Sequence, residues 1–119
     1  MRDKELIKTE TIGEFEINTY FFPEEIHPDD LFDYEALASD NQTAAEYRED
    51  LLNGIESGRY LWIIGQVTAW KNGIELASTS LGACLHDSAD DFFDENGYYP
   101  DMVKEVINEA KNTIKKLAL

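Results

Sequence analysis

The sequence predicts an α+β domain in which helices pack on a small antiparallel sheet of three strands, in the order β-α-α-β-β-α-α. Three observations predict this class. Residues 11–22 alternate between apolar and polar side chains, as a half-buried strand does. Asn72-Gly73, the strongest two-residue hairpin signal, joins two runs of strand-forming residues. An apolar stripe at helical spacing begins at Val103.

The first strand is expected over residues 11–22 and ends at Pro23. One of its faces would hold Gly13, Phe15, Ile17, Thr19 and Phe21. Pro28 suits a first helical position, and the two acids after it suit the positive end of a helix dipole. A short helix is therefore expected over residues 28–38. The side chains that it would bury are Leu31, Phe32 and Leu37.

The second helix has signals at both of its ends. Thr43 and Glu46 have the spacing of a capping box, and Gly58 is expected to stop the helix near Ser57. The apolar residues at helical spacing within it are Tyr47, Leu51, Leu52 and Ile55. These signals predict an amphipathic helix over residues 43–57.

Two strands are expected on either side of the Asn72-Gly73 turn, over residues 60–71 and 74–85. Both faces of the first run are apolar near its start, so it is expected to be a central, covered strand. A tight turn predicts four facing pairs: Lys71 with Ile74, Trp70 with Glu75, Ala69 with Leu76, and Val67 with Ser78.

Two further helices complete the chain. Ser88 is expected to cap a short helix over residues 88–94. Pro100 and Asp101 would open the last helix, over residues 100–119, with lysines at its negative end. Its apolar stripe is Val103, Val106, Ile107, Ala110, Ile114 and Leu117.

Length and composition indicate one domain over residues 1–119, because 43% of the side chains are hydrophobic, which is too rich for disorder. No apolar run approaches the ~18 residues of a membrane span. The N-terminus lacks the apolar stretch of a signal peptide, and the single cysteine, Cys84, fits a reducing compartment. The chain is therefore expected in the cytosol, that of a host cell.

The charge distribution is the strongest functional signal. The net charge is -15, and residues 11–103 alone carry -17. Residues 11–58 hold thirteen acids and one base, Arg48. Nucleic acid and anionic membranes are excluded as direct ligands, because both require Lys and Arg to neutralise phosphates. A basic protein partner is expected instead.

No catalytic or cofactor-binding constellation is found. His27 precedes a proline in an expected loop, and Cys84 with His86 forms a C-x-H pair without further zinc ligands. The acids of residues 87–101 do not fit an EF-hand register, because Gly97 at position 6 would put Phe92 at position 1. We therefore expect no enzyme activity, no cofactor and no specific metal site.

The acids of residues 24–56 are the candidate partner-binding surface. They are Glu24, Glu25, Asp29, Asp30, Asp33, Glu35, Glu46, Glu49 and Asp50. Side chains four apart on a helix lie about 5–6 Å apart, and duplex DNA carries one charge per about 1.7 Å of axis. Such an array can imitate a phosphate track. The alternative is an ordinary solvated surface that serves solubility. The near absence of bases favours the first interpretation, because helix faces usually intersperse Lys with Glu.

Part of the chain resembles a known group. The run from Val67 to Cys84, then Asp91-Phe92-Phe93 and the segment from Gly97 to Val103, is similar to small uncharacterised proteins of phages and mobile elements. The resemblance covers roughly residues 60–110 and leaves the acidic N-terminal half unmatched. It implies a genomic setting in which small acidic proteins include anti-CRISPR and antirestriction DNA mimics.

The sequence therefore predicts a phage-derived acidic inhibitor that blocks a nucleic-acid-binding defence enzyme by DNA mimicry. Contacts would come from the acids of residues 24–56, joined by those of residues 87–95. The alternative is a small acidic immunity or regulatory protein that binds a basic partner such as a toxin. Displacement of nucleic acid from the partner separates the two.

Overall fold

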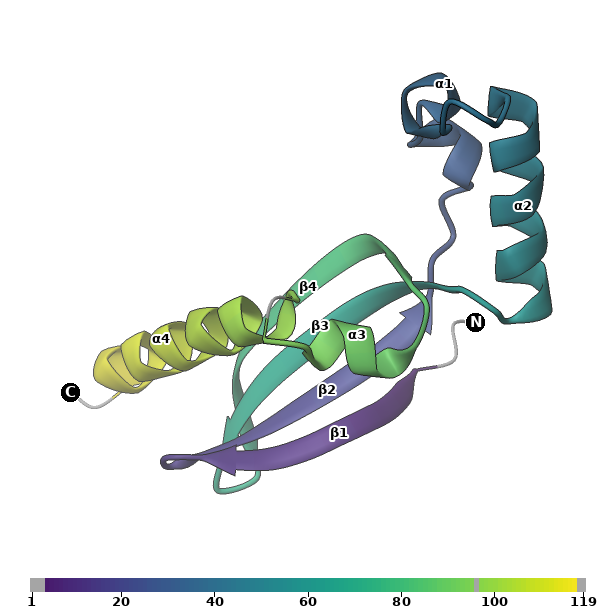
Figure 1. The fold of residues 1–119 in the computed structure, drawn as a ribbon. Coiled ribbons are helices and arrows are strands. Elements are labelled where there is room, and N and C mark those ends of the chain that lie inside the picture. The colour runs from purple at the N-terminus through teal and green to yellow at the C-terminus, as the bar shows by residue number, and fades with distance from the viewer. Residues whose placement is uncertain (1–3, 96, 118–119) are drawn as a thin grey trace.

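The computed structural model describes residues 4–95 and 97–117 and shows a four-stranded antiparallel sheet with a helical extension at one end (Figure 1). The sheet order is β1-β2-β3-β4, with β1 Glu5–Ile12, β2 Phe15–Pro23, β3 Leu61–Lys71 and β4 Ile74–His86. The helices are the 3₁₀ helix η1 (Pro28–Asp30), α1 (Tyr34–Leu37), α2 (Ala44–Ser57), α3 (Ala89–Phe93) and α4 (Tyr99–Leu117). None of the helices in these residues is both long enough and apolar enough to cross a bilayer.

The α+β class is confirmed, but the three-strand sheet and the predicted element order are wrong. The strand predicted over residues 11–22 begins too early, because residues 11 and 12 end a further strand, β1, and a two-residue turn at Gly13-Glu14 joins β1 to β2. Gly13 has φ +61°, which a glycine adopts without steric cost. The sequence pattern did not predict β1, because it is an edge strand that carries charged side chains. One of these, Glu10, accepts a hydrogen bond from the Tyr99 hydroxyl of α4.

The β3–β4 hairpin confirms the predicted turn and corrects its register. Asn72 and Gly73 both have positive φ, 54° and 78°, as a type I′ turn requires. Two of the predicted pairs are present, Lys71 with Ile74 and Trp70 with Glu75. The other two are wrong by one residue, since Ala69 faces Ala77 and Val67 faces Thr79. A bulge that leaves Leu76 without a facing residue produces the shift. The central position expected for β3 is confirmed.

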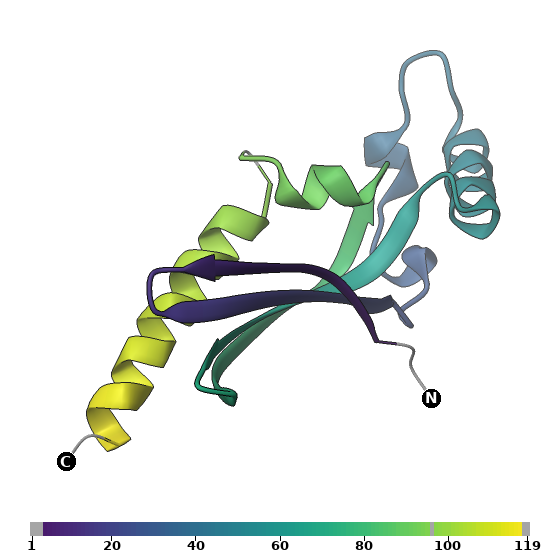
Figure 2. The same cartoon turned by 90° about the horizontal axis from the view of Figure 1, so that it is seen from below.

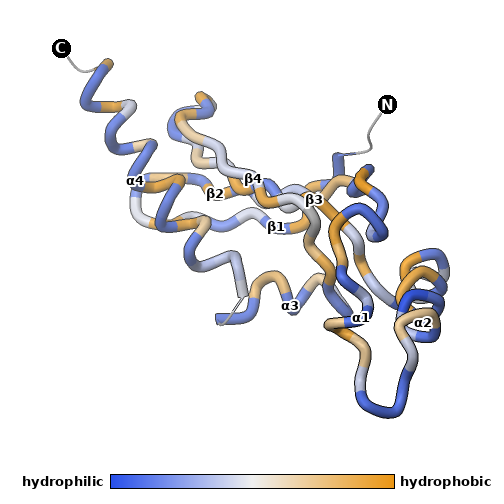
Figure 3. Tube along the Cα trace, turned by 90° about the horizontal axis from the view of Figure 1, so that it is seen from above, coloured by the Kyte–Doolittle hydropathy of each residue, from blue (hydrophilic) through white to orange (hydrophobic). Residues whose placement is uncertain are grey.

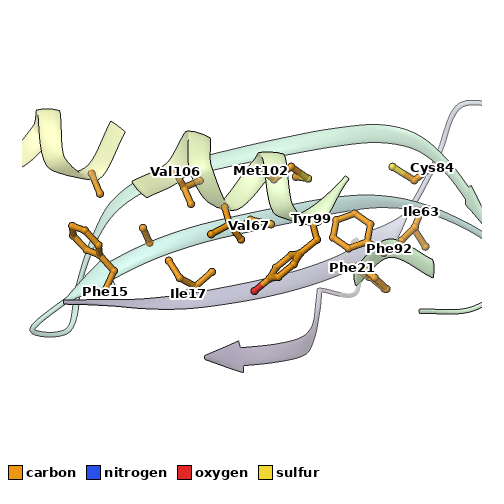
Figure 4. Close-up of a cluster of buried hydrophobic side chains, with 13 residues drawn as sticks. Phe15, Ile17, Phe21, Ile63, Val67, Cys84, Phe92, Tyr99, Met102 and Val106 are labelled. Atoms are coloured by element: carbon orange, nitrogen blue, oxygen red, sulfur yellow. The ribbon is translucent and has the colours of Figure 1, made fainter. Parts of the chain in front are cut away.

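Helix α4 lies on one face of the sheet and closes the core (Figure 4). Val103, Val106 and Ala110 are buried, as predicted, and Ile107 and Ile114 pack against the core with part of their surface exposed. The last member of the predicted stripe, Leu117, is 71% exposed because the helix has run beyond the sheet by then. Residues 118–119 of the predicted helix lie outside the described residues.

Helix α3 covers the same face near the end of β4. The Phe92 ring of α3 is fully buried and lies against β3 at Gly65, where a Cβ atom would stand 2.5 Å from the ring. The short helix predicted over residues 88–94 is confirmed as Ala89–Phe93. The cap is wrong, because the Ser88 side chain makes no capping hydrogen bond.

Residues 24–58, called the acidic lobe from here on, project from the sheet at the end opposite to α4 (Figures 1 and 2). Within the lobe, α1 and α2 pack chiefly against each other. The molecule measures 60 × 27 × 23 Å, and its radius of gyration is 17.4 Å. A compact chain of this length would have a radius of about 13.5 Å. The lobe is therefore an extension and contributes little to the main core.

The helix predicted over residues 28–38 is wrong. The chain forms η1 and then α1, and Leu31, Phe32 and Asp33 between them are not helical. The helix restarts at Tyr34 because the Asp33 carboxylate accepts a hydrogen bond from the Ala36 backbone nitrogen. Of the expected buried residues, Leu31 and Leu37 are 48% and 47% exposed, and only Phe32 is half-buried.

Helix α2 confirms the predicted second helix. Thr43 and Glu46 form the capping box, and Gly58 ends the helix with φ +82°. Only Leu51 and Gly54 are buried on it, so most of the helix surface faces solvent. The loop before the helix, residues 39–42, is strongly hydrophilic (Figure 3).

Candidate partner-binding surface

The acidic lobe attaches to the sheet through main-chain and indole hydrogen bonds. Trp62 of β3 donates from Nε1 to the Ile26 carbonyl at 2.8 Å, and the Glu24 nitrogen donates to the Trp62 carbonyl at 3.1 Å. The Phe32 ring contacts the Trp62 ring, with 5.5 Å between centroids. These contacts fix the entry of the chain into the lobe, so its acids have a defined place relative to the sheet.

The lobe contains eleven acids and one base. All nine predicted partner-binding residues lie in it, and the structure divides eight of them into two groups, while the ninth, Glu25, is exposed where the chain enters the lobe. One group holds the lobe together through hydrogen bonds or an ion pair. The other group projects into solvent.

Asp29 belongs to the first group. Arg48 of α2 binds it at two points, from Nε to Oδ1 and from Nη2 to Oδ2, both at 2.8 Å. The Tyr34 hydroxyl also donates to Oδ1 at 2.8 Å. Because Arg48 and Tyr34 donate to the carboxylate, the pKa of Asp29 is lowered to about 2. Burial and the neighbouring Asp29 charge raise the pKa of Tyr34 to about 12.

Four further acids have local structural roles. Asp33 caps α1, and Glu46 completes the capping box of α2. Asp50 accepts a hydrogen bond from Gln42 Nε2 at 3.2 Å, and Glu24 accepts one from the Ile26 nitrogen at 3.1 Å. Asp29 and Asp33 lie four residues apart within the predicted helix of residues 28–38, but they do not share one helix face, because the chain between them is not continuously helical.

The second group faces outward. Within the described residues, the side chains of Asp30, Glu35 and Glu49 are exposed and make no hydrogen bond or ion pair. Glu49 and Glu56 lie two turns apart on the exposed face of α2. The one basic residue of α2, Arg48, pairs with Asp29 instead. The outward surface of α2 therefore carries carboxylates without interspersed cations.

Three apolar side chains in the same lobe as these acids are exposed. Sequence reasoning missed this exposure. Ile26, Leu31 and Leu37 are each about half exposed, at 48%, 48% and 47%. The sequence placed two of them in a core, since an apolar residue at helical spacing is usually buried. Exposed apolar side chains among charged ones are a feature of protein interfaces. Small counter-ions do not stabilise such side chains.

A second acidic segment, residues 87–95, meets the acidic lobe at a cavity of about 450 Å³, called the junction cleft from here on. Its lining residues are Gln42, Tyr47, Asp50, Leu51, Tyr60, Leu85, His86, Asp87 and Asp91. They come from the lobe, the strand ends and α3, which are distant in sequence. No spacing rule could have found this set, although the composition of residues 87–95 indicated an acidic site there.

Two of the three residues considered for chemistry, Cys84 and His86, lie in packed surroundings. Cys84 is buried, its Sγ lies 3.3 Å from the Leu81 carbonyl, and burial raises the pKa of the thiol. Burial likewise lowers the pKa of His86, whose ring packs edge-on against Phe92. Residues 4–95 and 97–117 contain no group of His, Cys, Asp and Glu arranged to hold a metal ion.

Comparisons with protein-family models, with curated proteins and with solved structures give no significant match.

Proposed function

We propose that this protein is an acidic, protein-binding inhibitor that occupies the nucleic-acid groove of a basic effector nuclease in a host cell. It would act as a stoichiometric DNA mimic. The resemblance of residues 60–110 to phage and mobile-element proteins supports a defence nuclease as the target.

The observation that carries the proposal is the orientation of charge on the lobe. Glu49 and Glu56 are exposed on α2 without a cation partner in the described residues, whereas the Arg48 side chain, itself 46% exposed, pairs with Asp29 of the same lobe. The acids stand on an extension of a molecule 60 Å long, away from the core that α4 closes. A projecting acidic element of this kind can enter a positively charged groove that is built for nucleic acid.

The alternative partner is a basic protein, such as a toxin, whose nucleic-acid groove is not involved. The exposed apolar residues Ile26, Leu31 and Leu37 favour this candidate, because a phosphate track offers no counterpart for them. Both candidates use the same lobe, so the distinction depends on what the bound protein displaces.

The test is competition. The partner is captured from a host lysate at low and high salt, identified, and bound to a labelled duplex. The protein is then titrated into that complex. Loss of bound duplex in proportion to added protein supports DNA mimicry, because one groove cannot hold both. A ternary complex that retains the duplex excludes mimicry and favours the alternative partner.

The matched variants are two double charge reversals of equal size. Glu49→Lys/Glu56→Lys alters the outward face of α2, and Glu75→Lys/Glu109→Lys alters exposed positions on β4 and α4. None of these four side chains has a hydrogen bond or ion pair within the described residues. We expect only the first variant to weaken partner binding, mainly through the association rate, with a larger effect at low salt. Equal weakening by both would reduce the effect to net charge.

A further inference from the structure

We propose that the junction cleft binds the guanidinium group of an arginine side chain presented by the protein partner. The inference deepens the proposed function and rests on it only for the source of the arginine. The chemistry of the cleft itself is carried by residues of both the lobe and the sheet.

The size and walls of the cleft fit an arginine side chain. Its volume of about 450 Å³ lies within the range of ligand pockets, about 300–1,000 Å³. Leu51 and Leu85 provide apolar surface for an aliphatic stem, and Tyr47 and Tyr60 provide aromatic rings. A planar guanidinium stacks on such rings and keeps its hydrogen-bond donors free at the edge.

Three carboxylates line the cleft, and within the described residues none of them has a cationic partner. Asp50 uses Oδ2 to accept from Gln42, and Asp91 uses Oδ2 to accept from the Asp87 nitrogen at 3.1 Å. Oδ1 of each remains without a hydrogen bond in those residues. The cleft therefore offers acceptors on two of its walls and no donor cation of its own.

The ring of Tyr60 already binds a guanidinium in this structure. Arg59 lies over it, with its Cζ atom 4.9 Å from the ring centroid, and donates from Nη2 to the Asp50 carbonyl at 3.2 Å. Arg59 does not line the cleft itself. The contact shows that a guanidinium packs on the Tyr60 ring and that Arg59 already covers part of this ring. His86 adds a buried Nε2 atom without a hydrogen-bond partner among the described residues.

The experiment measures binding of small probes to the full chain by amide chemical-shift titration. The probes are N-acetyl-arginine amide and N-acetyl-citrulline amide, which is a neutral isostere of it. We expect the arginine probe to shift amides of residues 47–51 and 85–91 saturably, and the citrulline probe to leave them unchanged. Equal binding of the two probes, or no saturable shift at these residues, overturns the inference.

Two variants separate the cleft from general attraction of cations. Asp50→Asn/Asp91→Asn keeps an acceptor at each position and removes two charges. We expect it to weaken the arginine probe by about tenfold or more, because each Asn keeps an acceptor but loses the charge that strengthens its hydrogen bond. Glu49→Gln/Glu56→Gln removes the same charge outside the cleft and is expected to change binding less than twofold. Equal weakening by both variants overturns the inference.

The source of the arginine is tested by comparison with agmatine, a free guanidine with a second positive charge. A protein side chain is supported as the source if, at high salt, the blocked arginine amide binds at least as tightly as agmatine once the second charge of agmatine is allowed for. Much tighter binding of agmatine overturns that source. Because no nuclease is present in these titrations, their failure leaves the duplex competition intact, and failure of the competition leaves these titrations intact.

Discussion

Arg48 and Asp29 form a two-point ion pair across nineteen residues of sequence, with both nitrogen–oxygen distances at 2.8 Å. The pair joins the middle of α2 to η1 and so defines how the two halves of the acidic lobe sit together. Tyr34 donates to the same carboxylate from α1. The only base among residues 24–58 is therefore paired with Asp29, and the exposed Asp30, Glu35 and Glu49 have no cation partner in the described residues.

The first prediction concerns this pair. Replacing Arg48 by Gln should raise the pKa of Asp29 from about 2 toward its ordinary value of 3.8, because the strongest donor to the carboxylate is lost. Carboxyl ¹³C titration by NMR measures this pKa directly. Arg59→Gln is the control, since Arg59 does not contact Asp29. A pKa that stays near 2 in Arg48→Gln would contradict the role of the pair.

The second prediction is the pH dependence of lobe order. The folded pKa of Asp29 is depressed, so its contribution to stability is present above the unfolded value near 3.8 and is lost as pH falls toward about 2. The protection of amides in η1 and α1, relative to their intrinsic exchange rate at each pH, should therefore fall across that window. The core under α4 should stay protected where the lobe begins to loosen. Simultaneous loss of protection in lobe and core would contradict a separately held lobe.

The third prediction concerns the core. Val106 is fully buried against the sheet, so Val106→Asp should lower the free energy of unfolding by about 3–5 kcal/mol, because an unpaired charge enters an apolar site. Asn108→Asp, on the exposed side of the same helix, should change it by no more than about 0.5 kcal/mol. Urea denaturation compares them. Similar costs for both would mean that α4 does not close the core.

The fourth prediction follows from the contact between Gly65 and Phe92. A Cβ atom at residue 65 would stand 2.5 Å and 2.7 Å from two ring carbons of Phe92, so Gly65→Ala should cost about 1–3 kcal/mol through overpacking. In a Phe92→Leu background the same change should cost less, because the ring is gone. A double-mutant cycle by thermal or urea unfolding measures the coupling. Additive costs would contradict the clash.

The fifth prediction concerns self-repulsion. Residues 11–103 carry -17, and most of their carboxylates lack a cation partner in the described residues, where Lys71 pairs with Glu14 and Arg48 with Asp29. Salt screens exposed charges beyond a Debye length of about 10 Å at about 0.1 M. The melting temperature should rise between about 10 and about 300 mM NaCl. A flat or falling melting temperature would show that the charges are already compensated locally.

The comparison of sequence with structure divides by the range of the interactions. The capping box at Thr43, the turn at Asn72-Gly73 and the stripe of α4 as far as Ile114 depend on neighbours a few residues away, and each was predicted correctly. The break in the helix predicted over residues 28–38 was missed. Asp33 was counted as a helix-face acid, whereas its carboxylate caps a new turn.

Sequence by itself determined that this chain is an α+β protein with strong negative charge on residues 24–58, since charge and periodicity are local properties. Only the tertiary structure decided that β1 joins the sheet, because an edge strand need not alternate in polarity. It also decided that Arg48 pairs with Asp29 and that Asp50 and Asp91 line the same junction cleft. Those relationships join segments far apart along the chain, and which segments meet depends on how the sheet twists and where the lobe leaves it.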